Sequence, residues 1–310
     1  MINNKIDLEK FLEPETRCDF YVSEMRKKIW LYELEMFDIF AGICERHGFT
    51  YYLGGGSLLG AARHEGFIPW DDDFDVGMPR ADYEEFLKVA KDEIPAPFLL
   101  QTHETEPGYL SCHAKLRHPD TTGIRYREWP DRHEYCQGIF FDIFPYDNIP
   151  DGKLRRKVHR FREQFLRKLL NNGPLYSRQR TSLFRKLAHW FSMFVNLFFP
   201  VEKVYQAHEK ICQKYNSVET EYWGPVSALY YNEKTYYKRA DFPNEKELFF
   251  ETIPAKVPGN YDSVLSSQYG DWHQFVKSDS IHGEVFFDVD KPWTEYIDRF
   301  SEFENFQQKI

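Results

Sequence analysis

Three aspartates alternate with other residues in the acidic segment 70–76, which reads WDDDFDV. In a strand, residues two apart face the same side, so Asp71, Asp73 and Asp75 would share one face while the intervening apolar residues enter the core. Aligned carboxylates repel one another, and a divalent cation removes that penalty. Oxygen ligands suit Mg²⁺ or Mn²⁺. We therefore predict a metal site at Asp73 and Asp75, with Asp71 as a further ligand; the alternative is an exposed acidic turn.

A second acid stands inside an apolar run. Asp142 interrupts Gly138–Phe144, which is otherwise typical of a buried strand. Burying an unpaired carboxylate costs several kcal/mol, which is comparable with the net stability of a domain. We therefore expect Asp142 to reach a metal, a cation or a cleft, unless it caps a neighbouring turn.

A glycine-rich turn, Gly54-Gly55-Gly56-Ser57, precedes the acidic segment. Glycines let a backbone approach a phosphate, and free amides at the start of a helix attract anions. The spacing is not that of a P-loop or of a dinucleotide fingerprint, so a plain structural turn is the alternative.

The elements around these residues alternate between strands and helices, which predicts a mixed α/β fold. Apolar spacing of three and four predicts a helix over 19–47, and we expect short helices over 58–63 and 82–92. Strands are expected at 49–53, 73–78, 98–102, 113–117 and 138–144, with strand-like runs at 222–223 and 229–231.

Charge is unevenly distributed along the chain. Between Lys153 and His189 there are twelve Lys or Arg residues and one acid, while the whole chain has a net charge of −9. The spacing of apolar residues from 151 to 217 predicts helices, with breaks at Gly173-Pro174 and Pro200. Within it, 187–199 carries Trp and Phe on one helical side, which suits a membrane headgroup region or a core helix. We predict a catalytic core at 19–150, an inserted basic helical segment at 151–217, and a C-terminal part at 218–300.

Composition excludes several classes of protein. The chain has 310 residues, of which 42% are hydrophobic, so it can bury a core. Its acidic balance argues against nucleic acid as a partner. The five cysteines lack CxxC spacing, which favours a reducing cytosol over a disulfide or zinc scaffold. We expect neither a signal peptide nor a membrane span.

Longer stretches of sequence resemble the LicD family, the phosphorylcholine transferases related to fukutin, which have a nucleotidyltransferase fold. The stretch 52–78, YLGGGSLLGAARHEGFIPWDDDFDVGM, carries most of the resemblance. GIFFDIFPYD at 138–147, KLR at 115–117 and YGDW at 269–272 are similar to the other family signatures. Phe74 and Phe141 stand where the family usually has aliphatic residues.

The resemblance implies metal-dependent transfer of phosphocholine from CDP-choline to a hydroxyl of a cell-surface glycan, such as a lipid-linked teichoic acid or lipopolysaccharide precursor. One or two Mg²⁺ or Mn²⁺ ions would be held by Asp73 and Asp75. Asp142 would complete that site or accept the proton of the sugar hydroxyl. The diphosphate of the donor and the leaving CMP would contact a set of glycine, serine and basic residues: Gly55, Gly56, Ser57, Arg63, Lys115 and Arg117.

The alcohol of the donor is left open. Proteins bind the quaternary ammonium group of choline in aromatic cages, and the candidate cage residues are Tyr109, Tyr126, Trp129, Trp223 and Tyr231. Ribitol phosphate or another CDP-alcohol is an alternative, as is a non-catalytic module that binds a glycan or a nucleotide. We expect a cytoplasmic protein, with peripheral attachment to the inner face of the membrane if 187–199 contacts lipid.

Overall fold

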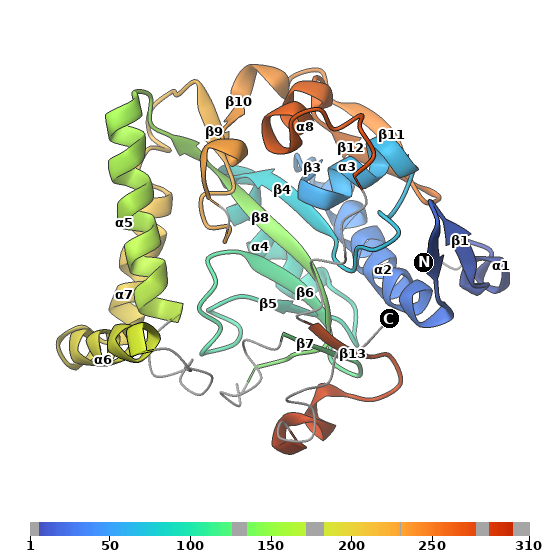
Figure 1. Ribbon diagram of the computed structural model, residues 1–310, viewed down its shortest axis with the longest axis horizontal. Helices are drawn as coiled ribbons and strands as arrows, with labels where there is room; N and C mark the ends of the chain where they lie inside the picture. The colour runs from blue at the N-terminus through green and yellow to red at the C-terminus, as the bar shows by residue number, and fades with distance from the viewer. Residues whose placement is uncertain (1–5, 126–134, 172–182, 230, 277–284, 300–310) are drawn as a thin grey trace.

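The computed structural model describes residues 6–125, 135–171, 183–229, 231–276 and 285–299 (Figure 1). A mixed seven-stranded sheet lies at its centre, and helices flank it, so the expected α/β class is confirmed. β8 is the longest strand and joins the two halves of this sheet. The sheet strands are β3 (Tyr52–Leu53), β4 (Asp75–Pro79), β5 (Leu99–Gln101), β6 (Ala114–His118), β8 (Ile139–Ile149), β9 (Tyr222–Gly224) and β10 (Tyr237–Lys238).

Parallel pairing of β4 with β8 sets the register of the sheet. Asp75 lies opposite Asp142 in this pair, and β6 adds to the other edge of β8 with Lys115 opposite Asp142. The apolar residues that alternate with these acids enter the core: Phe74 stacks on Phe37 at 4.8 Å between ring centroids. Acids and core residues therefore occupy opposite faces of the same strands, as expected from the two-residue period.

The apolar face of the sheet is covered by α2 (Glu24–His47) and α4 (Arg80–Glu93) (Figure 1). A serine at position 23 caps α2, because its side chain accepts a hydrogen bond from the amide of Arg26. The expected start at residue 19 was wrong, since β2 (Phe20–Val22) pairs there with β1 (Glu15–Arg17) after α1 (Leu8–Leu12). Gly48, with φ +70°, ends α2 as predicted.

Further expected bounds differ from the structure; for example, the strand expected at 138–144 continues to Ile149. β4 begins at Asp75 rather than Asp73, so Asp71 and Asp73 lie in the loop before the strand. α3 (Gly55–His64) begins inside the glycine turn rather than at residue 58, because Gly54 is its N-cap. No strand is assigned to Leu229 or Tyr231 among the residues described, although Tyr222–Gly224 forms one.

The remaining elements lie at the two ends of the sheet (Figure 1). α3, α8 (Tyr261–Tyr269) and the hairpin of β11 (Lys246–Phe250) and β12 (Ile253–Val257) gather near β3. At the far end of β8, the segment predicted to be helical forms α5 (Lys153–Asn171), α6 (Leu183–Phe198) and α7 (Val201–Cys212); its expected break at 173–174 lies outside the described residues. β7 (Thr122–Arg125) pairs with β13 (Val285–Asp288). Short 3₁₀ helices cover Glu233–Thr235, Arg239–Asp241, Trp293–Glu295 and Ile297–Arg299.

Pro200 ends α6 as expected, because it caps the N-terminus of α7. Residues beyond 217 contribute β9 and β10 to the central sheet. The three-part domain division proposed above stays a prediction.

Candidate active site on the acidic face of the central sheet

The glycine turn packs directly against the acidic segment. The amide of Asp75 donates to the hydroxyl of Ser57 at 2.8 Å, and the amide of Gly54 donates to the carbonyl of Asp75 at 3.0 Å. A Cβ at Gly56 would lie 2.6 Å from Oδ2 of Asp71, and one at Gly55 would lie 3.0 Å from Oδ2 of Asp75. Gly55 also has φ +48°, which side chains disfavour. The glycines are therefore required for the first turn of α3 to approach the carboxylates.

Asp71, Asp73 and Asp75 are gathered here although only Asp75 lies in a strand. Burial, and then the charge of Asp73, raises the pKa of both Asp71 and Asp75 well above the usual range. Helix α2 fixes the loop that carries Asp71 and Asp73, because Arg26 and Trp30 donate hydrogen bonds to the carbonyl of Asp71 at 2.8 and 3.1 Å. Tertiary contacts thus produce the acid cluster that the strand argument predicted.

A buried glutamate lies beneath this cluster. Glu33 of α2 is 1% exposed, and its Oε2 lacks a hydrogen-bond partner among the described residues. Burial raises its pKa well above the usual range, and so do the charges of Asp73, Asp72 and Asp71. Sequence reasoning missed this residue; the available signal was an acid among the regularly spaced apolar residues of α2.

Asp142 lies beside Asp75 but in a different electrostatic environment. Its carboxylate contacts the Nζ of Lys115, lies 3.2 Å from Nη2 of Arg125, and lies 3.4 Å from Nε2 of His113. Burial alone would raise the pKa of Asp142, but Lys115, His113 and Arg125 together hold it well below the usual range. Of the three partners expected for Asp142, a metal, a cation or a cleft, the structure shows cations, which are Lys115 and Arg125.

The two basic residues predicted in β6 have different surroundings. Lys115 contacts Asp142, whereas Arg117 donates to Oε1 of Gln101 at 2.9 Å and to the carbonyl of Gly138 at 2.6 Å. Arg117 is 1% exposed, so it holds strands together. Arg125 of β7 is the cation that sequence reasoning missed, and it brings a second positive charge to Asp142. The sequence feature that could have indicated it is an arginine at the end of the short β-rich run 122–125.

Arg63 of α3 contacts the YGDW signature, which begins at the last residue of α8. Arg63 donates to Nε2 of His64 at 3.0 Å and to the carbonyl of Trp272 at 3.4 Å, which ties α3 to the chain after α8. Burial raises the pKa of the Tyr269 hydroxyl, as do Tyr237 and then the carboxylates of the acidic segment. The signature therefore contributes a tyrosine whose pKa is affected by the acid cluster, a role that was not assigned from sequence.

The candidates for an aromatic cage do not converge. Tyr109 lies near Asp142, with its ring centroid 6.2 Å from that of His113. Trp223 packs on Phe242 at 4.7 Å in the core, and Tyr231 hydrogen bonds to His159 at 2.9 Å beside α5. The other two candidates, Tyr126 and Trp129, lie outside the described residues.

The fit of a divalent cation rests on the acid cluster. Within the described ranges, no three His, Cys, Asp or Glu side chains form a group that could hold a metal ion. Mg²⁺ is often bound through one or two carboxylates with water and substrate phosphates completing its shell, so such a group is not required. The mutual repulsion of Asp71, Asp73 and Asp75 fits a cation. Asp142 already has positive partners, so its part as a ligand is not supported by its contacts.

Comparisons with known proteins agree with this geometry. Residues 48–178 match the family described as LicD/FKTN/FKRP, nucleotidyltransferase domain. The chain is 31% identical to the lipopolysaccharide cholinephosphotransferase LicD of Haemophilus influenzae over 251 residues, which are 77% of this chain and 88% of that protein. It is also 60% identical over 37 residues to the ribitol 5-phosphate transferase FKRP of Homo sapiens and of Mus musculus, which is 12% of this chain and 8% of each relative.

The family match at residues 48–178 includes the glycine turn and the acidic segment, and the match to the Haemophilus transferase spans more than three quarters of the chain. The latter match favours a transferase over the non-catalytic module considered above. The chain belongs to the LicD family and is a phosphotransferase.

Proposed function

We propose that the chain transfers phosphocholine from CDP-choline to a hydroxyl of a cell-surface glycan precursor of the lipopolysaccharide or teichoic acid type. The observation that carries this proposal is the packing of the glycine turn against Asp71 and Asp75, beside the cations around Asp142. Phosphoryl transfer needs little covalent chemistry from the protein, since positioning and charge neutralisation dominate. A backbone turn, an acid cluster and nearby cations are the parts that this reaction uses.

The amides at the start of α3 are suited to the phosphates of the donor. Gly55 and Gly56 leave the backbone uncovered, and the hydroxyl of Ser57 remains able to donate while it accepts from Asp75. Lys115 and Arg125 would neutralise charge on the phosphates and the leaving CMP. Arg63 and Arg117 are less suited to this task, since the hydrogen bonds they make within the described residues go to other parts of the fold and not to an acid of the site.

Asp142 is a weak candidate for the general base. A carboxylate whose pKa is held well below its usual range by three neighbouring donors accepts a proton poorly at neutral pH. We infer that it orients Lys115 and Arg125 instead.

Asp73 and Asp75 are the residues that would hold Mg²⁺ or Mn²⁺, with Asp71 next to them. When bound, the ion would neutralise the diphosphate of the donor. This assignment is supported by the unfavourable accumulation of carboxylates at this place, which a cation offsets.

A second candidate donor is a CDP-polyol such as CDP-ribitol. The 37-residue match to the ribitol 5-phosphate transferase supports it, and the cage candidates do not converge among the described residues. The two donors differ only in the alcohol, so the contacts of the nucleotide and of the diphosphate do not distinguish them.

We also propose that α6 attaches the protein to the inner face of the membrane. Within the described ranges no helix has the length and apolar character to cross a bilayer. The side chains of Trp190 and Leu197 are nevertheless 73% and 79% exposed, so this helix does not use that surface to pack on the catalytic body. Exposed aromatic and aliphatic side chains beside a basic helix are typical of headgroup binding.

Release of CMP from CDP-choline in the presence of a glycan acceptor tests the proposal. We expect release with Mg²⁺ or Mn²⁺ and none with EDTA, and we expect CMP to inhibit competitively. A matched assay with CDP-ribitol identifies the alcohol, because the true donor should have the higher kcat/KM. Transfer at an undiminished rate in EDTA would contradict the metal, and turnover of neither donor would contradict the reaction.

A further inference from the structure

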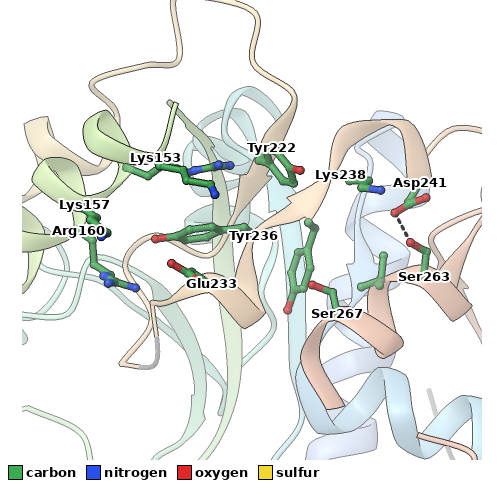
Figure 2. Close-up of a pocket in the computed structure, with 13 residues that line it drawn as sticks. Lys153, Lys157, Arg160, Tyr222, Glu233, Tyr236, Lys238, Asp241, Ser263 and Ser267 are labelled. Atoms are coloured by element: carbon green, nitrogen blue, oxygen red, sulfur yellow. Dashed lines mark hydrogen bonds between the residues drawn. The ribbon is translucent and has the colours of Figure 1, made fainter. Parts of the chain in front are cut away.

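A second, basic pocket lies between α5 and α8. Figure 2 shows Lys153, Lys157 and Arg160 of α5 on one side, near Tyr222 of β9 and Tyr236, and Ser263 and Ser267 of α8 on the other side. The cavity measures about 550 Å³, which is large enough for a monosaccharide with a phosphate group. None of the glycines or acids of the candidate active site lines it.

The charge of this basic pocket is not balanced by the protein. Its five cationic side chains are Lys153, Arg156, Lys157, Arg160 and Lys238, and none forms an ion pair within the part of the chain that is described. Two acids face them. Of these, Asp241 accepts hydrogen bonds from Asn260 at 2.8 Å and Ser263 at 2.7 Å, so it is already engaged, and Glu233 is exposed. A net positive cavity without internal partners favours an anionic ligand.

Tyrosines fix the position of one of these cations. The guanidinium carbon of Arg156 lies 4.9 Å from the ring centroid of Tyr222 and 5.9 Å from that of Tyr236. Stacked guanidinium groups lose little conformational freedom on binding and form bidentate hydrogen bonds with phosphate. Ser263 and Ser267 line the wall formed by α8, but their hydroxyls already donate to Asp241 and to the carbonyl of Lys234, so the cations are the groups available to an anion.

One tyrosine connects this pocket with the acid cluster. Tyr237 lines the pocket, and its ring centroid lies 5.9 Å from that of Tyr146, whose hydroxyl would lie 3.3 Å from a Cβ at Gly54 in the glycine turn. The hydroxyl of Tyr237 donates to Oε1 of Gln268 at 2.8 Å, and Nε2 of Gln268 donates to the hydroxyl of Tyr269 at 3.2 Å. Since the amide of Gly54 also donates to the carbonyl of Asp75, the pocket lies near the glycine turn and the acidic segment.

We propose that the basic pocket binds a phosphate group of the acceptor glycan and thereby positions the acceptor for transfer. This inference rests on the proposed function and specifies its acceptor: a phosphorylated saccharide rather than a neutral one. The donor has its own phosphate contacts at the start of α3. The enzyme would thus hold two anionic substrates at separate positive sites, which limits the repulsion between them.

Charge reversal on α5 tests the pocket with matched residues. The double variant Lys157→Glu/Arg160→Glu changes two lining residues, whereas Arg155→Glu/Arg162→Glu makes the same change of charge on the same helix, at exposed positions outside the pocket. The single variant Lys157→Gln, at an exposed position, provides the same test if the double variant does not fold. Calorimetry would measure binding of glucose 6-phosphate, with glucose as the neutral control and with neither donor nor metal present.

We expect the full-length wild-type protein and the control variant to bind glucose 6-phosphate but not glucose. The pocket variant should bind at least about tenfold more weakly, and Lys157→Gln should show a smaller loss. Equal binding by wild type and pocket variant would overturn the proposal, and so would an equal loss in the control. Displacement of the sugar phosphate by CMP would assign the pocket to the nucleotide, and displacement only by phosphatidylglycerol vesicles would assign it to lipid; either result overturns it.

The same variants separate this inference from the reaction. With a phosphorylated acceptor, the pocket variant should raise KM for the acceptor at least about tenfold with a smaller change in kcat, and the control variant should not. If sugar-phosphate binding follows the pocket but no transfer occurs, the proposed reaction fails and the anion site stands. If transfer occurs with unchanged acceptor KM in the pocket variant, the inference fails and the reaction stands.

Discussion

The central sheet and the helical segment α5–α6 carry charge in opposite ways. On the sheet, carboxylates are close together and largely removed from water, so the pKa of each one depends strongly on its charged neighbours. On α5, the cations that line the pocket have no ion pairs with the rest of the described chain, and α6 exposes aromatic side chains. Buried charge shapes the fold itself, whereas exposed charge and apolar surface leave the fold nearly unaffected and are available to ligands.

The same contrast exists between two neighbouring acids of the sheet. Asp75 is surrounded by other carboxylates, and Asp142 is surrounded by donors. Their pKa values are consequently displaced in opposite directions although the residues are register partners. Substitutions at these two positions should therefore affect stability with opposite signs, and substitutions on α6 should hardly affect it.

The largest expected effect is on catalysis at the acid cluster. Asp75→Asn or Asp73→Asn should reduce transfer by on the order of 10³-fold, because a ligand is lost from the cation that would neutralise the diphosphate of the donor. Because the folded-state pKa of Asp75 is raised, its ionisation weakens folding as pH rises above the ordinary value of about 3.9. Asp75→Asn should leave the melting temperature in EDTA equal or higher at pH 7, and the difference should vanish at acid pH.

Transfer assays and thermal denaturation of the same preparations check this prediction. Near-normal transfer by either variant would refute the metal assignment. A markedly lower melting temperature of Asp75→Asn in EDTA would mean that the carboxylate is balanced by groups of the protein after all.

The next effect distinguishes the two acids. Asp142→Asn leaves Lys115 buried without its partner, so we expect a loss of about 3 to 5 kcal/mol in the free energy of unfolding. Since the folded-state pKa of Asp142 is lowered, this stabilisation is present above its ordinary pKa and disappears as pH falls. Urea denaturation at pH 7 and at pH values near 3 measures it, with Asp75→Asn as the comparison. A loss of the same size in both variants would remove the distinction.

A smaller effect on activity is expected at the glycine turn. Gly56→Ala would place a Cβ 2.6 Å from Oδ2 of Asp71, so the carboxylate must move, and transfer should fall about tenfold or more. Gly42→Ala in α2 is the matched control, since its Cβ would meet only the flexible end of Arg46 at 3.5 Å. Binding of CMP in the presence of Mg²⁺, followed by calorimetry, should weaken in the first variant alone. Unchanged activity of Gly56→Ala would argue against the phosphate cradle.

The smallest effect on the fold is expected at α6. Replacing Trp190, Phe191 and Phe194 with Ser should remove the salt-resistant part of binding to anionic vesicles, while the melting temperature and transfer to a short acceptor without lipid stay close to those of the wild type. Vesicle co-sedimentation at low and high salt measures this, and Phe249→Ser, at another exposed aromatic, is the control. Unfolding of the triple variant would identify α6 as part of the core, and wild-type protein that ignores anionic vesicles at low salt would remove the membrane from the proposal.

Much of the fold follows from local patterns in the sequence. The two-residue period separates the faces of β4 and β8, and it correctly predicts that Phe74 enters the core while Asp75 does not. The spacing of three and four predicts α2, and Gly48 marks its end. The helical period and Pro200 predict the segment from α5 to α7. These signals depend only on residues near one another in the chain, so a sequence contains them completely.

Tertiary structure decided which charges meet. Asp71 and Asp73 join Asp75 through a loop that α2 holds, and not through a common strand, so the predicted cluster formed for a different reason. The partners of Asp142 come from β6 and β7, and the wall of the basic pocket is built from α5, β10 and α8. The sequence determined which residues are able to carry charge and on which face of an element they lie. Only the packing of distant elements determined whether that charge is repelled, balanced or left for a ligand, because electrostatic energy depends on distance in space and on burial.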